Sequence, residues 1–319
     1  MGKVVITRRI PPPAEEILKS AGHEVVVSPM PRPLSREELK NFVVGADGIL
    51  SLLTDKIDGE VMDAAGDKLK IIANYAVGFD NINLTDATQR KIVVTNTPGV
   101  LTEAVAEHTF ALILSLAKNI VEADKFTRSG GYQGWEPELF LGQSLYQKTI
   151  GIIGAGRIGG YVAKAAQGFS MKIIYHDVRR NEEFEKATGS QFVDLMTLLS
   201  NSDIVTIHVP LTSETKHLLG AAHFPLMKKT ALLINTSRGG VIDEEALVSA
   251  LQAGTIGGAG LDVYENEPRL AEGLTHLKNV ILTPHTASAT LEARSAMSKI
   301  AAENIVAVLS GQAPLNPAQ

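Results

Sequence analysis

The chain has 319 residues, which at roughly 150 residues per domain predicts about two domains. Hydrophobic residues make up 45% of the chain and charged residues 20%, a composition typical of a soluble globular protein and not of a fibrous or disordered one. Lysine and arginine number 30 against 35 aspartates and glutamates, so the net charge of −5 gives no electrostatic reason to bind nucleic acid or an anionic membrane. The absence of cysteine excludes disulfides, thiolate nucleophiles and cysteine-ligated metal sites.

The N-terminus shows none of the features of an export signal. Residues Met1–Ile6 run directly into a short apolar stretch, which Arg8 and Arg9 follow. No apolar run approaches the roughly 18 residues that a membrane span needs. We therefore expect a cytoplasmic protein with no membrane partner.

Short apolar runs alternate with helical patterns along the chain. A first series of strands is predicted at Val4–Ile6, Gly48–Leu53, Leu69–Ala73 and Ile92–Thr95, with helices at Ala14–Ser20, Arg36–Val43 and Asp58–Ala65. The second series has strands at Thr149–Ile153, Lys172–Tyr175, Asp203–Ile207, Ala231–Ile234, Gly260–Asp262 and Val280–Leu282, with helices at Ile158–Gln167, Leu195–Leu199 and Glu244–Gln252. This alternation predicts doubly wound parallel sheets that helices cover on both faces.

Two further helices mark where the predicted domains meet. The apolar helix Glu103–Lys118 follows the turn-forming residues Asn96–Gly99, and the helix Leu291–Leu309 closes the chain after Pro284. We therefore expect residues 99–285 to form one α/β domain and residues 1–98 with 286–319 to form the other.

The strongest local signal is a glycine-rich turn that follows a predicted strand and opens a predicted helix. Gly154, Gly156 and Gly159 have the spacing G-x-G-x-x-G. The first glycine permits a tight turn, the second lets the backbone approach a pyrophosphate, and the third lets helix and strand pack closely. Backbone N–H groups at the helix start, at Arg157 and Ile158, can receive the phosphates. The turn therefore predicts a dinucleotide site, with a purely structural turn as the alternative.

Asp177 bears on the choice of cofactor. It ends the next predicted strand, 177 − 159 = 18 residues after the third glycine. A carboxylate at this place accepts both ribose hydroxyls of NAD and repels the 2′-phosphate of NADP, so NAD is the expected cofactor. Arg179 and Arg180 follow at once and could accommodate that phosphate, so NADP stays open.

Three polar residues follow consecutive strands of the second series. Reduction of a 2-oxo acid by a nicotinamide needs a cation to hold the carboxylate, an acid to protonate the developing alkoxide, and a carboxylate to orient that acid. Arg238, Glu267 and His285 each come just after a predicted strand. Open parallel sheets bind ligands at the carboxyl ends of their strands, so we expect these three side chains to supply the three functions.

Other residues have weaker signals. His208 and Pro210 end a strand and are interpreted as lining the adenine side of the cofactor, with a structural turn as the alternative. No cluster of His, Asp and Glu has the spacing of a metal site, so no metal is expected.

The chain resembles the family of D-isomer-specific 2-hydroxyacid dehydrogenases. The similarity covers essentially the whole chain and rests on motifs at Tyr75–Asn83, Ala106–Glu107, Gly154–Gly159, Asn235–Gly239, Leu261–Pro268 and Pro284–His285. The resemblance implies a homodimer of two-domain subunits, with a Rossmann NAD-binding domain inserted in a flavodoxin-like substrate domain. It also implies that Arg238, Glu267 and His285 are catalytic, with His285 as acid/base.

The same resemblance implies further site residues. Backbone N–H groups of Val77 and Gly78 are assigned to the substrate carboxylate, and Leu53 is expected as another substrate contact. The nicotinamide side is assigned to Thr236 and Ser237, and the nicotinamide carboxamide to Asp262.

Within the family the chain looks most similar to the glyoxylate/hydroxypyruvate reductases. Phosphoglycerate dehydrogenases carry an arginine near Leu52 for the substrate phosphate, and Ser51–Thr54 contains none. Trp135 resembles a residue of this branch that either approaches the partner subunit's site or packs the dimer interface. We therefore expect NAD(P)H-dependent reduction of glyoxylate or hydroxypyruvate to the 2-hydroxy acid.

Two alternatives to this activity stay open. One is a dehydrogenase of another D-2-hydroxy acid, such as D-lactate or D-3-phosphoglycerate. The other is a nicotinamide-sensing binding protein that resembles the C-terminal-binding-protein corepressors.

Overall fold

The computed structural model describes residues 2–318, which form two compact units. The first unit comprises the chain up to Leu101 together with the segment that starts at Ala289, and the second unit is Thr102–Ser288. The boundaries expected from the sequence lie a few residues earlier, after residues 98 and 285.

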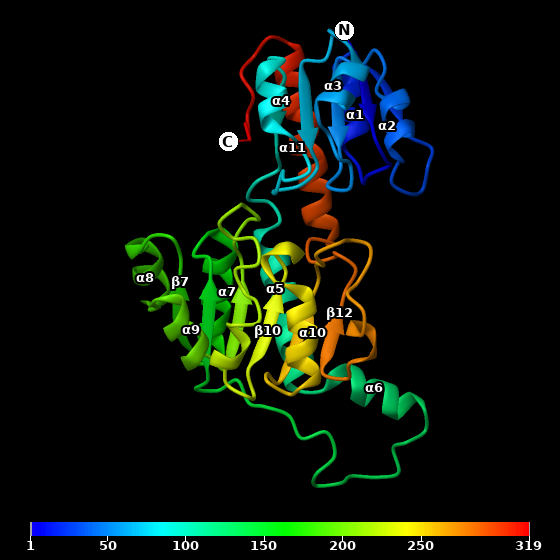
Figure 1. Cartoon of the computed structure of the whole chain (residues 1–319). Coiled ribbons are helices and arrows are strands. Elements are labelled where there is room, and N and C mark those ends of the chain that lie inside the picture. Colours follow the sequence, from blue (N-terminus) through cyan, green and yellow to red (C-terminus); the bar gives the residue numbers. More distant parts are fainter. Residues whose placement is uncertain (1, 319) are drawn as a thin grey trace. The chain divides into compact units, whose positions relative to one another are not determined.

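The first unit is built on a five-stranded parallel sheet with the order β2-β1-β3-β4-β5 (Figure 1). Its strands are β1 (Lys3–Ile6), β2 (Glu24–Val27), β3 (Gly48–Ser51), β4 (Ile71–Asn74) and β5 (Val93–Thr95). This strand order confirms the flavodoxin-like prediction. The expected strand Gly48–Leu53 is shorter than predicted, because the chain turns at Leu52, whose carbonyl accepts the N–H of Asp55 at 2.9 Å.

The helices that cover this sheet in the described part of the chain are α1 (Ala14–Ser20), α2 (Arg36–Phe42), α3 (Gly59–Ala65), α4 (Leu84–Gln89) and α11 (Leu291–Leu309). The last of them, α11, packs against α1 and against β3 and β4. Thr290 caps its first turn by accepting the N–H of Ala293 at 3.1 Å. The C-terminal helix is therefore part of the core of the first unit, although more than 180 residues separate it from that unit's last strand.

The second unit is built on a seven-stranded parallel sheet with the order β12-β11-β10-β9-β6-β7-β8. Its strands are β6 (Thr149–Ile153), β7 (Lys172–His176), β8 (Gln191–Phe192), β9 (Ile204–Ile207), β10 (Leu232–Asn235), β11 (Gly258–Leu261) and β12 (Val280–Leu282). The order reverses at β6, the strand before the glycine-rich turn, as in the Rossmann fold. The predicted fold of this unit is thereby confirmed.

Helices pack on both faces of the second sheet because its strands send alternate side chains to opposite faces. Leu232 and Ile234 of β10 join one core cluster, whereas Leu233 joins the other. The first cluster lies under α5 (Thr102–Ala117) and α7 (Arg157–Gly168), the second under α9 (Leu195–Asn201) and α10 (Glu244–Gln252). The remaining helices of the described chain are α6 (Ile120–Arg128), α8 (Glu182–Thr188) and the short 3₁₀ helices η1 (Phe224–Leu226), η2 (Gly239–Val241) and η3 (Leu274–His276).

No single helix within residues 2–318 is long and apolar enough to cross a membrane. Over the same residues, only the pair α5 and α6, taken together, passes that test of length and composition, and it is bent by 62° at its break.

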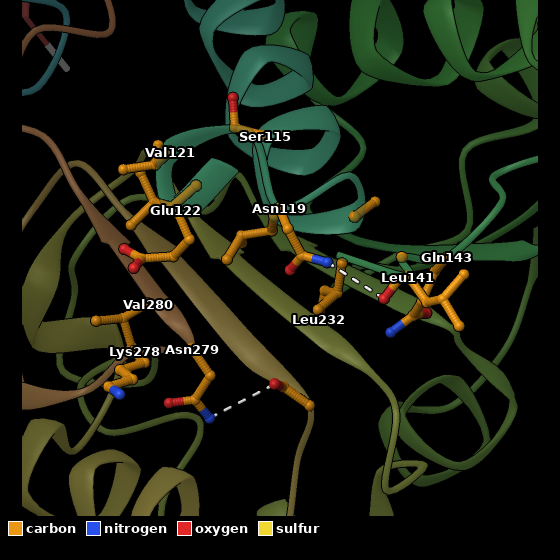
Figure 2. A pocket seen from close by; sticks show the side chains of 15 residues that line it. Ser115, Asn119, Val121, Glu122, Leu141, Gln143, Leu232, Lys278, Asn279 and Val280 are labelled. Carbon is orange, nitrogen blue, oxygen red and sulfur yellow. Dashed lines mark hydrogen bonds between the residues drawn. The ribbon is translucent and has the colours of Figure 1, made fainter. Parts of the chain in front are cut away.

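A small cavity lies at the amino ends of the strands in the second unit (Figure 2). Leu232 and Val280, which begin β10 and β12, line it together with Asn119 and Leu141. The amide Nδ2 of Asn119 donates to the carbonyl of Leu141 at 3.2 Å. None of the residues predicted for catalysis lines this cavity, so its position gives no support for a reaction site there.

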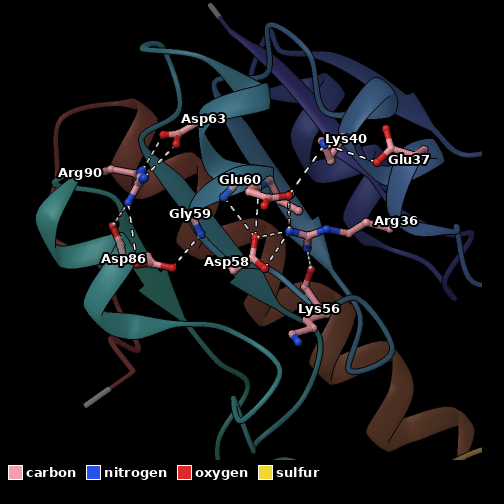
Figure 3. Close-up of polar contacts among 11 residues, drawn as sticks. Arg36, Glu37, Lys40, Lys56, Asp58, Gly59, Glu60, Asp63, Asp86 and Arg90 are labelled. Carbon is pink, nitrogen blue, oxygen red and sulfur yellow. Dashed lines mark hydrogen bonds and ion pairs between the residues drawn. The ribbon is translucent and has the colours of Figure 1, made fainter.

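A network of ion pairs joins α2 to α3 in the first unit (Figure 3). Nη2 of Arg36 lies 2.6 and 2.8 Å from the two carboxylate oxygens of Asp58 and 3.0 Å from Oε2 of Glu60. Asp58 also caps α3, because its Oδ1 accepts the N–H groups of Glu60 and Val61. Burial acts to raise the pKa of Asp58, but the hydrogen bond from Arg36 and those from the helix N–H groups outweigh it, so the pKa is lowered.

A second part of this network joins α3 to α4. Arg90 donates from Nε and Nη2 to the two oxygens of Asp63 at 2.6 and 2.9 Å, and Oδ2 of Asp86 accepts the N–H of Gly59 at 2.7 Å. The hydrogen bond from Arg90 lowers the pKa of Asp63. The three short helices α2, α3 and α4 are thus tied to one another through charged groups.

We expect the substitution Asp58→Asn to lower the free energy of unfolding at pH 7 by about 0.5–1 kcal/mol, since asparagine still caps the helix but loses the ion pair. A carboxylate with a lowered pKa stabilises the fold above its ordinary pKa of 3.8, and this contribution is lost as the pH falls through the lowered value. The difference between variant and parent should therefore disappear in acid. Urea unfolding at pH 7 and at pH 3 measures it, with the exposed Asp67→Asn as control, and a difference that persists undiminished at low pH would contradict the assignment.

Candidate active site

The carboxyl ends of β10, β11 and β12 lie side by side in the sheet of the second unit. Asn235 pairs with Leu261, and Leu261 pairs with Leu282, so these residues form one row across the three strands. The residues predicted for catalysis, Arg238, Glu267 and His285, lie in the turns that begin at this row. The strand register therefore delivers all three turns to the same edge of the sheet.

His285 and Glu267 form a direct pair. The ring nitrogen Nδ1 of His285 lies 2.9 Å from Oε2 and 3.2 Å from Oε1 of Glu267. The side chains are 23% and 31% exposed, so both are accessible from solvent. No described residue is in hydrogen-bond contact with Nε2 of His285, which leaves that nitrogen available for a substrate.

The backbone around His285 is held by Asp262. This aspartate is fully buried at the end of β11, and its carboxylate accepts the N–H groups of Thr286 and Ala287, each at 2.8 Å, and the hydroxyl of Thr283 at 2.6 Å. The carbonyl of Asp262 accepts the N–H of His285 at 2.9 Å. These contacts hold His285 at a φ of 55°, in the left-handed region that non-glycine residues rarely adopt.

Burial acts to raise the pKa of Asp262, but the hydrogen bonds from His108, from Thr283 and from the two N–H groups lower it overall. Asp262 is therefore ionised at neutral pH. In the structure, Asp262 anchors the segment that carries His285. Its contact with a nicotinamide carboxamide stays a prediction.

Asn235 organises the turn that carries Arg238. Its Oδ1 accepts the N–H and the hydroxyl of Ser237 at 3.0 and 2.9 Å, and its Nδ2 donates to the carbonyl of Arg238 at 2.9 Å. Nη1 of Arg238 donates to the carbonyl of Ser237 at 2.8 Å. The neighbouring Thr236 is buried and shares a hydrogen bond of 3.0 Å with the hydroxyl of Thr109 on α5.

The glycine-rich turn has the shape that a pyrophosphate requires. A Cβ at Gly154, where φ is 102°, would lie 2.7 Å from the carbonyl carbon of His208, and a Cβ at Gly159 would lie 2.1 Å from the carbonyl oxygen of Gly154. Gly156 is the N-cap of α7, no described side chain caps that helix, and a Cβ there would meet nothing within 4 Å. The N-terminus of α7, with Arg157 and Ile158, thus lacks a side-chain cap, which leaves its N–H groups suited to phosphate binding.

Asp177 lies beside this turn. Its Oδ2 accepts the N–H of Ala155 and its Oδ1 accepts the N–H of Val178, each at 2.7 Å. Each carboxylate oxygen has a second lone pair, so the group can still accept hydroxyl donors. Of the two arginines that follow, Arg180 is paired with Glu185 at 2.8 Å, whereas Arg179 is exposed and contacts no described carboxylate.

His208 also approaches the glycine-rich turn, since its N–H donates to the carbonyl of Ile153 at 2.7 Å. Its Nε2 is 2.9 Å from the hydroxyl of Thr206, and its buried Nδ1 has no partner among the described residues. Burial lowers the pKa of His208 to about 3, so the ring is neutral. Pro210 follows on the surface.

Leu53, Val77 and Gly78 belong to the first unit, where asparagine amides hold their loops. Asn74 donates from Nδ2 to the carbonyl of Gly78 at 2.9 Å, and Asn96 donates to the carbonyl of Val77 at 2.7 Å. The N–H groups of Val77 and Gly78 donate to no described residue. Two adjacent unused donors are suited to a carboxylate.

Some residues around the site were not singled out as functional from the sequence. Glu244, at the start of α10, and His108, on α5, both contact the turns that carry predicted catalytic residues, His108 through Thr283 at 3.0 Å. The only feature of the sequence that points to Glu244 or His108 is that each is a polar residue on a mostly apolar helix face. Within residues 2–318, no group of three or more His, Asp or Glu side chains could hold a metal ion.

Comparison with known proteins identifies the family. A family profile described as the NAD binding domain of D-isomer specific 2-hydroxyacid dehydrogenases matches residues 110–287. The glyoxylate reductase of Thermococcus litoralis is 50% identical over 318 residues, which cover 98% of this chain and 96% of that protein. The chain belongs to the D-isomer specific 2-hydroxyacid dehydrogenases.

Solved structures of other proteins have the same fold. A protein from Thermus thermophilus superposes with a TM-score of 0.92 at 43% identity, over 99% of this chain and 100% of that chain. An NADPH-dependent glyoxylate/hydroxypyruvate reductase from Sinorhizobium meliloti superposes with a TM-score of 0.86 at 33% identity, over 100% of this chain and 98% of that one. The second unit of this dehydrogenase is therefore its NAD-binding domain, which agrees with the shape of the glycine-rich turn.

We expect Gly156→Ala to weaken NADH binding by about tenfold or more while leaving the melting temperature close to that of the parent. The added methyl group would meet no protein atom but would occupy space in front of the α7 N–H groups. Fluorescence titration with NADH and thermal unfolding measure the two effects. Gly160→Ala, whose methyl would make only ordinary contact with Phe184 at 3.9 Å, is the control, and equal NADH affinity in both variants would rule out this turn as the phosphate site.

Proposed function

We propose that this protein reduces glyoxylate or hydroxypyruvate to the corresponding 2-hydroxy acid with a reduced nicotinamide cofactor. The proposal rests on the pair of His285 and Glu267. Nδ1 of the imidazole contacts the carboxylate of Glu267, whereas Nε2 contacts no described residue and can reach a substrate. Relatives about half identical over nearly the whole chain, from Thermococcus litoralis and Thermofilum pendens, are named glyoxylate reductases.

We assign a different role to each of the three predicted catalytic residues. Reduced nicotinamide, when bound, supplies the hydride for the carbonyl carbon. Arg238 holds the substrate carboxylate and polarises the carbonyl, because its guanidinium offers several donors in one plane. Nε2 of His285 donates a proton to the carbonyl oxygen as negative charge develops there. Glu267 accepts the N–H of Nδ1, which fixes the orientation of the ring.

The first unit contributes neutral donors to the proposal. We assign the unused N–H groups of Val77 and Gly78 to a carboxylate, with Leu53 as an apolar contact. The turn Ser51–Thr54 offers no cation for a phosphate, which favours a small substrate such as glyoxylate over D-3-phosphoglycerate. Turnover with glyoxylate, hydroxypyruvate, pyruvate and 3-phosphohydroxypyruvate separates these activities, and absence of turnover with all four would favour the nicotinamide-sensing alternative.

NAD is the cofactor that Asp177 favours, because its charge disfavours a 2′-phosphate. If the cofactor is NADP, Arg179 is the residue that we assign to its 2′-phosphate, since Arg180 is paired with Glu185. The Sinorhizobium relative is described as NADPH-dependent. His208, Pro210, Thr236, Ser237 and Asp262 are retained as proposed cofactor contacts.

We further propose a homodimer, supported by the segment 130–147. This segment has no helix or strand and runs away from the sheet of the second unit (Figure 1). It exposes Trp135 at 83%, Leu141 at 73% and Tyr132 at 58%, an apolar surface that a partner subunit can cover. Whether Trp135 packs the interface or approaches the partner subunit's site stays open, and a cytoplasmic location stays a prediction.

We expect His285→Ala to lower kcat for glyoxylate reduction by on the order of 10²–10⁴ while NADH affinity stays near that of the parent. Glu267→Gln keeps the shape of the side chain but removes its charge. The pH above which activity declines should therefore be lower in this variant than in the parent. The pH profile of kcat/KM measures this change, and the exposed His276→Ala serves as control. Normal turnover in His285→Ala would show that another group supplies the proton.

Asp177→Asn should reduce the preference for NADH over NADPH by about tenfold or more. Asparagine can still accept the N–H of Ala155, so the turn should remain intact while the charge is lost. The ratio of kcat/KM for the two cofactors is the measurement, with Glu183→Ala as an exposed control for lost charge. A ratio equal to that of the parent would mean that Asp177 does not contact the ribose.

A further inference from the structure

Glu244 is a buried carboxylate that the catalytic assignment does not use. It is the first residue of α10, it is only 5% exposed, and it lies one residue after the helix cap Asp243. Its Oε2 accepts the backbone N–H of Glu265 at 3.1 Å, while its buried Oε1 has no hydrogen-bond partner within residues 2–318. An unpaired buried carboxylate oxygen costs free energy, so its presence calls for an explanation other than stability alone.

The group that Glu244 holds is the turn that carries Glu267. Two successive N–H groups of this turn bind two different carboxylates, because Tyr264 donates to Oε1 of Glu267 at 3.1 Å and Glu265 donates to Glu244. The turn with Arg238 lies against the same peptide, since a Cβ at Gly239 would be 1.9 Å from the carbonyl carbon of Tyr264. A shift of Glu244 would therefore move the backbone on which both Glu267 and its neighbouring turn depend.

The charges around Glu244 come from this same turn. Burial raises the pKa of Glu244, and the charges of Glu265 and Glu267 raise it further, whereas the N–H groups of Glu265 and Ala271 oppose this. Glu265 is itself paired with Nε2 of His217 at 2.7 Å. The phenol of Tyr264 also faces the cluster, and burial with the charges of Asp262, Glu244 and Glu267 raises its pKa to about 12. Glu244 and Glu267 thus belong to one coupled group of charges.

We propose that Glu244 is a positioning residue of the active site, which binds the backbone of the turn that carries Glu267 and adds a negative charge to that turn. This inference rests on the proposed function, because it requires His285 to act as the acid. In its ionised form, Glu244 adds negative charge to the surroundings of the proton donor assigned to this site.

The decisive variant is Glu244→Gln, which keeps an acceptor for the N–H of Glu265 and removes the charge. We expect the alkaline limb of the kcat/KM profile for glyoxylate reduction to move to lower pH by about 0.3–1 unit. Glu267→Gln, measured beside it, should move the limb further in the same direction. Glu245→Gln removes an equal charge from an exposed position one residue along α10, and its limb should match that of the parent.

The outcomes separate the two proposals. A limb that moves in Glu267→Gln but not in Glu244→Gln overturns this inference and leaves the proposed function standing. A limb that moves in neither variant overturns both this inference and the role of Glu267. If the limb moves equally in Glu245→Gln and Glu244→Gln, loss of any negative charge on α10 has the same effect, and the inference is also overturned.

A second variant keeps the inference testable if Glu244→Gln does not fold. Glu244→Asp retains the charge but withdraws the carboxylate from the N–H of Glu265. We expect the alkaline limb to stay near that of the parent while kcat falls, because the turn is displaced. Parental kcat in this variant would contradict the positioning role.

Discussion

The parallel register of β10, β11 and β12 is the constraint on which the rest of the site depends. Because Asn235, Leu261 and Leu282 occupy one row, three chain segments of different length leave the sheet at the same level. Their side chains can meet without any long reach, and the pair of His285 and Glu267 closes at 2.9 Å. The meeting of these side chains at this edge is therefore a consequence of strand pairing in the core.

Buried carboxylates fix the turns that follow these strands. Asp262 binds the N–H groups of Thr286 and Ala287, and Glu244 binds the N–H of Glu265, so the turns that carry His285 and Glu267 are each held by a buried acidic side chain. A charged acceptor makes a stronger hydrogen bond than a neutral one in a poorly solvated place. The charge proposed for Glu244 and its anchoring of the turn thus reside in the same carboxylate.

Much of this arrangement could be predicted from the sequence, because it depends on local patterns. The helix Glu244–Gln252 and the strands Thr149–Ile153 and Val280–Leu282 have the predicted bounds, since short apolar runs and helix caps define them. The edge strand β2 and the helices α6 and α8 were not predicted: β2 and α6 bury no side chain fully, and α8 buries only two. Anchors such as Asp262 to Ala287 join residues far apart in the chain, and no spacing rule reveals them.

The loops that carry predicted site residues are held by different groups in the two units. In the first unit neutral amides do the holding: Nδ2 of Asn81 donates to the carbonyls of Leu52 and Asp55, and Asn74 donates to that of Gly78. These amides consume carbonyl acceptors and leave the N–H groups of Val77 and Gly78 unused. In the second unit charged groups do the holding, and they surround the residues to which proton transfer is assigned. Neutral donors can bind a carboxylate without altering the charge balance around His285, so recognition of the anion and control of the proton can be set by different residues.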